Sequence, residues 1–131
     1  MKILFLTIAW PKTGNYNIYT DLMDEVIANG HQVTVACSAE ARTGIKTGLE
    51  TINGIHVLHI ATGNLTQIPF IEKGISNLKV GGQFKSAINK YFANERFDLI
   101  IMSTPPITLS GVFGDLKKKY KAKTYLLLKD I

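Results

Sequence analysis

The 131-residue chain has little of what marks several classes of protein. It has one cysteine, Cys37, so no disulfide can form within it. It has no CxxC or HExxH motif, and His31, His56 and His59 are poorly spaced for a metal site, so we expect no metal. No apolar run approaches the ~18 residues that cross a bilayer as a helix. The start lacks a signal-peptide cleavage site, and we therefore expect a cytoplasmic protein.

The sequence also lacks the glycine-rich motifs that hold phosphates in two large groups of nucleotide-binding enzymes. Neither GxGxxG nor GxxxxGK[ST] occurs, which disfavours NAD binding and P-loop phosphate chemistry. Cys37 lies in an apolar run, where a buried and unreactive thiol is favoured over a reactive one.

An excess of positive charge is present, but it is local. The net charge is +5, and one short segment supplies it: Lys117, Lys118, Lys119, Lys121 and Lys123. One interpretation is a solvated helix end, where lysine suits the negative end of the helix dipole. The other is contact with an anionic membrane surface, worth about 1 kcal/mol per lysine. Nucleic-acid binding is not expected, because few aromatic residues interleave with these lysines and no binding motif surrounds them.

Apolar runs alternate with helical patterns, which predicts a single α/β domain over residues 1–131 with a Rossmann-like, doubly wound, mostly parallel sheet. The predicted strands cover residues 2–9, 32–37, 97–102 and 123–128, and the predicted helices cover residues 17–29, 71–92 and 109–120. Residues 49–60 predict a β-hairpin inserted into this pattern, because Asn53-Gly54 is the dipeptide that a tight hairpin turn prefers.

Three local features refine this prediction. Residues 38–48 are polar and contain glycine, which predicts a mobile loop. Gly81-Gly82 should kink or split the second long helix. Ser103 and Thr104 precede two prolines, a pattern typical of the capped start of a helix, and this role is favoured over that of a nucleophile.

The candidate site follows from the predicted parallel sheet. Ligands bind beyond the carboxyl ends of such strands, so three strand-end segments should meet at one edge: 10–16, 103–106 and 129–131. The candidate substrate-binding residues there are Trp10, Gly14, Asn15, Tyr16, Ser103, Thr104, Pro105 and Lys129. Core packing is the alternative for Trp10, and a plain turn glycine is the alternative for Gly14. Asp130 is a candidate catalytic carboxylate, with a frayed terminal residue as the alternative; no other catalytic residue can be named.

Several segments together resemble a known family. They are the opening MKILFL, NGHQVTV at 29–35, NGIHV at 53–57, FDLII at 97–101, STPP at 103–106 and YLLLKDI at 125–131. This order resembles the N-terminal half of GT-B glycosyltransferases, more narrowly the retaining family 4 type that builds bacterial capsule and O-antigen polysaccharides, in its aminosugar-transferase branch. Two positions depart from the pattern: Asn15 stands where many members have a second glycine, and Lys129 where many have a histidine. No catalytic histidine is therefore expected here.

The resemblance implies two Rossmann-like domains around a cleft. The chain would be the acceptor-binding one, and the donor-binding domain would lie outside it, so we expect little or no transferase activity from these residues alone. The implied substrates are a nucleotide-diphosphate sugar as donor and a lipid-linked saccharide as acceptor, with no cofactor and usually no metal. The implied place is the inner face of the plasma membrane, where the protein would be peripheral.

Two other functions stay open. The chain could be a non-catalytic α/β ligand-binding or regulatory module, which differs from a transferase in needing no second domain. A nucleotide-dependent oxidoreductase is a third possibility, held back by the absent dinucleotide motif.

Overall fold

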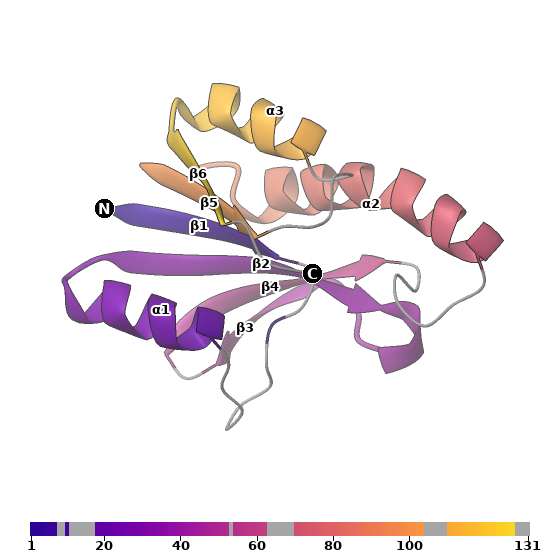
Figure 1. The fold of residues 1–131 in the computed structure, drawn as a ribbon, viewed down its shortest axis with the longest axis horizontal. Helices are drawn as coiled ribbons and strands as arrows, with labels where there is room; N and C mark the ends of the chain where they lie inside the picture. The colour runs from indigo at the N-terminus through magenta and orange to yellow at the C-terminus, as the bar shows by residue number, and fades with distance from the viewer. Residues whose placement is uncertain (8–9, 11–17, 53, 63–69, 104–109, 128–131) are drawn as a thin grey trace.

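A computed structural model describes residues 1–7, 10, 18–52, 54–62, 70–103 and 110–127. The elements are β1 (Lys2–Thr7), α1 (Ile18–Ala28), β2 (Gln32–Glu40), the short 3₁₀ helix η1 (Ala41–Thr43), β3 (Gly48–Ile52), β4 (Ile55–Thr62), α2 (Phe70–Tyr91), β5 (Leu99–Ser103), α3 (Ser110–Tyr120) and β6 (Lys123–Leu127). The strands form one six-stranded sheet in the order β3-β4-β2-β1-β5-β6 (Figure 1). All neighbouring strands are parallel except β3 and β4.

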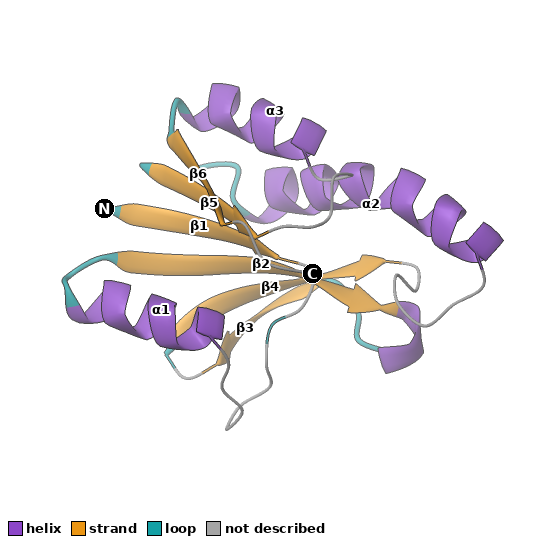
Figure 2. Ribbon diagram, in the orientation of Figure 1, coloured by secondary structure: helices purple, strands orange, loops and turns teal. Residues whose placement is uncertain are grey.

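The helices cover both faces of the sheet, as expected for a doubly wound fold. Helix α1 lies on one face, and α2 and α3 lie side by side on the other (Figures 1 and 2). The predicted fold class is therefore confirmed. The predicted hairpin is also confirmed, since β3 and β4 pair antiparallel and Gly54 has a φ of 81° at the turn between them; Asn53 lies outside the described residues.

Alternation along the strands produces two hydrophobic cores. Leu4 and Leu6 of β1 point to the α2 and α3 side, while Ile3 and Phe5 point to the α1 side. On the first side the sheet packs against Phe84 of α2 and its neighbours, and on the second side against α1. Because both faces of the central strands are buried, these strands are apolar almost throughout, which is why their sequence pattern was clear.

The segment after the second strand differs from the prediction. Residues 38–48 were expected to be a mobile loop, but β2 continues to Glu40, η1 follows, and β3 begins at Gly48. The strand continues because β4 pairs with it from Thr34, opposite His56, as far as Glu40, opposite Thr62. Pairing with a neighbouring strand thus outweighs the polar composition of this segment.

The glycine pair does not split helix α2, which was one of the two outcomes expected of it; the other, a kink, stays a prediction. One helix continues from Phe70 to Tyr91 through Gly81 and Gly82. Val80 and Phe84, on either side of the pair, are fully buried against the sheet. Burying such side chains stabilises by about 1.5–3 kcal/mol each, which exceeds the roughly 1 kcal/mol that each glycine costs in a helix.

Candidate functional site

The candidate site lies where the strand order reverses. From β1 the chain moves outward to β2 and then to β4, and α2 returns it to β5 on the other side of β1 (Figure 1). The carboxyl ends of β1 and β5 therefore flank the switch point of the sheet. In open α/β sheets this is the position at which ligands bind.

Two hydroxyl groups meet at this point. The last residue of β1 is Thr7 and the last of β5 is Ser103, and the Ser103 hydroxyl donates to Thr7 Oγ1 at 3.0 Å. Both residues are only 4% exposed. The hydrogen bond ties the two strand ends together.

Ser103 is the last described residue of β5, and residues 104–109 lie outside the described part of the chain. The helix-capping role expected of Ser103 and Thr104 therefore stays a prediction. Ser103 lies at the carboxyl edge of the sheet, and its contact with a substrate also stays a prediction.

A second hydroxyl pair lies at the same edge, on the opposite face. Ser38, near the end of β2, and Thr62, the last residue of β4, are hydrogen-bonded to each other through their side chains. The sequence analysis missed Thr7, Ser38 and Thr62. The available signal was that each is a small hydroxyl residue near the carboxyl end of an otherwise apolar strand.

Trp10 stands just beyond β1 and packs on the α1-side core. Its ring meets Phe5 edge-on, with 5.9 Å between ring centroids, and Tyr19 of α1 approaches Phe5 at 5.5 Å. Trp10 is partly buried, so the core-packing interpretation is confirmed. Its role in substrate contact stays a prediction.

Most of the other candidates cannot be placed. Gly14, Asn15, Tyr16, Thr104, Pro105, Lys129 and Asp130 lie outside the described residues. The strands that lead into these segments are nevertheless placed. Because β1, β5 and β6 are parallel neighbours, Thr7, Ser103 and Leu127 end at one edge of the sheet, as the prediction requires.

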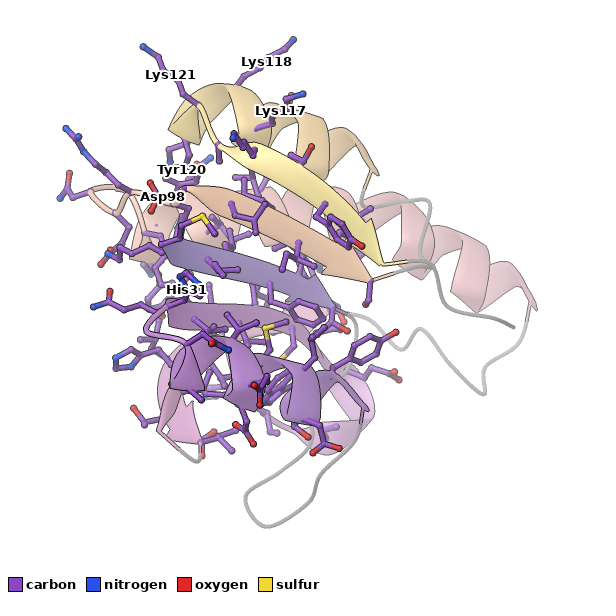
Figure 3. The ribbon with its side chains drawn as sticks, turned by 60° about the vertical axis from the view of Figure 1, so that its left-hand side comes forward. His31, Asp98, Lys117, Lys118, Tyr120 and Lys121 are labelled. Carbon is purple, nitrogen blue, oxygen red and sulfur yellow. The ribbon has the colours of Figure 1, made fainter. Side chains whose placement is uncertain are left out.

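The lysine cluster lies at the opposite edge. Lys117, Lys118 and Lys119 end α3, Lys123 begins β6, and Lys121 lies between them, at the amino edge of the sheet (Figure 3). The structure therefore does not bring the lysines together with the substrate-site candidates. Strands β5 and β6 have five residues each, so the two edges are separated by roughly 17 Å.

Helix α3 ends with the usual closing hydrogen bond, but a lysine takes a backbone conformation that glycine usually adopts. The Ala122 amide donates to the Lys117 carbonyl at 3.3 Å, which closes the helix. Lys121 there has a φ of 52°, a conformation that costs a non-glycine residue about 1–2 kcal/mol. Next to it, the Tyr120 hydroxyl donates to the Phe92 carbonyl at 2.9 Å. Burial, and secondarily the charge of Glu95, raises the pKa of Tyr120.

A polar chain on the α1 face was also missed by sequence reasoning. Cys37 Sγ lies 3.6 Å from His59 Nδ1, and His59 Nε2 lies 2.9 Å from a carboxylate oxygen of Glu50 on the edge strand β3. Burial, with a smaller effect from Glu50, raises the pKa of the Cys37 thiol to about 12. The thiol is 1% exposed and protonated at neutral pH, so this arrangement does not activate a nucleophile, and the predicted buried cysteine is confirmed.

Among the described residues, no group of three or more His, Cys, Asp or Glu side chains is arranged to hold a metal ion. No helix in the described part of the chain combines the length and the hydropathy needed to cross a membrane.

Comparison with solved structures agrees with this geometry. A structure described as the glycotransferase of kitacinnamycin matches 97% of this chain with a TM-score of 0.63 and 13% identity. A structure described as trehalose-6-phosphate from E. coli, bound with UDP-2-fluoro glucose, matches 96% of the chain with a TM-score of 0.59 and 9% identity. The fold is the Rossmann-like fold of GT-B glycosyltransferases.

This chain corresponds to only part of each of the two solved structures. The matched part is 30% of the first solved chain and 32% of the second, so this chain spans about a third of the length of either. No family model and no curated protein matches the sequence. At identities this low the likeness defines the fold, and the function is argued separately below.

Proposed function

We propose that the chain is the acceptor-side domain of a glycosyltransferase. In this proposal the complete enzyme moves a sugar from a nucleotide-sugar donor to a lipid-linked saccharide during bacterial surface-polysaccharide synthesis, such as that of capsule or lipopolysaccharide. The observation that carries the proposal is the hydroxyl-lined switch point at Thr7 and Ser103, on a fold shared with glycosyltransferases. The sequence resemblance to the retaining family 4 type supports the finer assignment.

The residues at this edge have side chains suited to different steps: binding the saccharide, contacting the donor phosphates and catalysing the transfer. A saccharide is rich in hydroxyl groups, which hydrogen-bond to side-chain and backbone groups and stack on an aromatic ring. Trp10, Tyr16 and the segments that follow Thr7 and Ser103 provide such groups. Asp130 is the carboxylate proposed to act in the transfer step, and Lys129 would face the donor phosphates. No cofactor takes part, because the donor arrives already activated by its diphosphate.

The membrane is a proposed partner through the exposed lysines at the end of α3. Because these lysines lie at the edge opposite Thr7 and Ser103, a membrane bound there would tether the protein without delivering the acceptor directly. Replacing all five lysines by glutamine should then abolish sedimentation with anionic vesicles. Unchanged sedimentation would remove the membrane, and the peripheral location at its inner face, from the proposal.

A transfer assay on the natural-length protein tests the enzymatic part. With a panel of nucleotide sugars and a polyprenyl-diphosphate-linked saccharide, labelled sugar should enter the lipid fraction. Asp130→Asn should lower the rate by about 100-fold, the usual effect of losing an acid or base group, while Asp115→Asn on the surface of α3 should leave it unchanged. A folded protein that transfers no sugar from any donor would instead indicate a non-catalytic binding module.

A further inference from the structure

A hollow of about 1050 Å³ opens at the amino edge of the sheet, away from the candidate transfer edge. Residues 93–98, between α2 and β5, line one side, and the end of α3 with the start of β6 lines the other. Four cationic side chains line it, namely Arg96, Lys119, Lys121 and Lys123, against two carboxylates, Glu95 and Asp98. The size is that of an ordinary small-molecule site.

The two carboxylates of the hollow are already engaged elsewhere. Glu95 forms an ion pair with the Lys2 ammonium group, and Asp98 Oδ2 accepts the backbone N–H of Lys2 at 2.8 Å. Lys119 Nζ is also engaged, since it donates to Asn89 Oδ1 at 2.6 Å.

Three cations of the lining are left without a carboxylate. Within the described part of the chain, Arg96, Lys121 and Lys123 form no ion pair. Four cationic side chains line the hollow against two carboxylates, and the Lys2 ammonium group offsets the charge of Glu95, so a positive potential that attracts an anion remains.

The backbone at Lys121 is an independent observation. The described residues contain four positions with positive φ, and the other three are Gly30, Gly44 and Gly54. At the fourth the chain has a lysine, although glycine or asparagine adopts this conformation more readily. Figure 3 shows the Lys121 side chain at the amino edge, extending outward from the end of α3 and away from Tyr120 and Asp98. The positive φ and the positive charge of the hollow thus coincide at one residue, Lys121.

We propose that this hollow binds a phosphate-bearing anion of at least two phosphates, held by Arg96, Lys121 and Lys123. Arg96 lines one side of the hollow, and Lys121 and Lys123 line the other. Cations spread in this way can bind an anion with several phosphates better than they can bind one small anion. The phosphates could belong to a free polyphosphate compound or to a lipid headgroup, which share this chemistry. The site is separate from the transfer edge, and the inference stands whether or not the protein transfers sugar.

Titration of the protein with inorganic tripolyphosphate tests the proposal without any transfer assay. Amide resonances of residues 95–98 and 119–123 should shift on binding, while those of Thr7 and Ser103 should not. Arg96→Gln should weaken binding about fivefold. The double variant Lys117→Gln/Lys118→Gln is the matched control, because it removes two charges from the same helix end outside the hollow.

Lys121→Gly gives two readouts that move in opposite directions. It should raise the melting temperature by about 2–5 °C, because it relieves the left-handed conformation. It should also weaken tripolyphosphate binding about fivefold. Binding as tight as that of the parent protein in both Lys121→Gly and Arg96→Gln would overturn the proposal, and so would equal weakening by the Lys117/Lys118 control.

Vesicles then identify the source of the phosphates. Binding to cardiolipin vesicles, whose headgroup carries two phosphates, that tripolyphosphate displaces and that Arg96→Gln weakens would identify a lipid headgroup in the hollow. Tripolyphosphate binding without competition from vesicles would identify a free anion. Vesicle binding without any tripolyphosphate binding would contradict the proposed site.

Discussion

At the scale of single residues, the hydrogen bond between Ser103 and Thr7 is the contact that matters most for the candidate site. It is buried, it joins two strands that are far apart in sequence, and it lies at the switch point of the sheet. A buried hydrogen bond of this kind contributes about 0.5–1.5 kcal/mol. It is therefore both a stabilising contact and a link between the two strand ends at the switch point.

Removing this hydrogen bond gives the first prediction. Ser103→Ala should lower the free energy of unfolding by about 1 kcal/mol, because a buried hydroxyl partner of Thr7 is lost. Urea unfolding measures the effect. Ser86→Ala, the same change at an exposed position of α2, should leave stability nearly unchanged. Equal stability of the two variants would show that the contact contributes nothing.

The buried thiol gives a prediction about pH. Burial raises the pKa of Cys37 in the folded protein to about 12, above the ordinary thiol value of 9.0, so the unfolded chain loses this proton first as the pH rises. The free energy of unfolding should therefore fall above pH 9, by up to about 1.4 kcal/mol per pH unit.

Other groups also titrate in that pH range, so the measurement compares the free energy of unfolding of the parent protein with that of a variant that lacks the thiol. Denaturant unfolding of the parent protein and of Cys37→Ala should be compared at several pH values from 8 upward. The advantage of the parent should shrink as the pH rises past 9. A difference that does not depend on pH would contradict the burial of a protonated thiol.

At the scale of elements, the sequence predicted those helices and strands whose formation depends on neighbouring residues in the chain. The Asn53-Gly54 dipeptide placed the hairpin, and continuous apolar runs placed the central strands, because both faces of those strands are buried. Pairing between distant segments was not predictable in this way. The extension of β2 to Glu40 depends on β4, and the unbroken α2 depends on burial against the sheet. The hydroxyl pairs at the carboxyl edge depend on strand order, which the sequence leaves open.

The glycines of α2 and of the hairpin give a paired prediction at this scale. A Cβ built on Gly82 meets no atom within 4 Å, so Gly82→Ala should stabilise the helix by about 0.4–1 kcal/mol. Gly54 has a φ of 81°, so Gly54→Ala should destabilise by about 1–2 kcal/mol although the space around it is also open. Thermal unfolding of both variants checks the signs, and a destabilised Gly82→Ala would show that α2 needs its glycine.

At the scale of the whole molecule, the two edges of one sheet have different characters. The carboxyl edge has hydroxyl groups, a partly buried tryptophan and the switch point between β1 and β5. The amino edge has the basic hollow and the lysines at the end of α3. Strand direction keeps the two apart, so the candidate transfer site and an anion bound in the hollow would not compete for space. The sequence showed both groups of residues but not that they lie at opposite edges.

The most direct measurement is the location of a bound acceptor on the molecule. Amide resonances would be followed while a water-soluble polyprenyl-diphosphate-linked saccharide is added, with inorganic tripolyphosphate present to occupy the hollow. The resonances that shift should be those of Thr7, Trp10 and Ser103 and of the segments that follow them. Shifts confined to residues 93–98 and 119–123, or to the hairpin, would contradict a ligand site at the junction of β1 and β5.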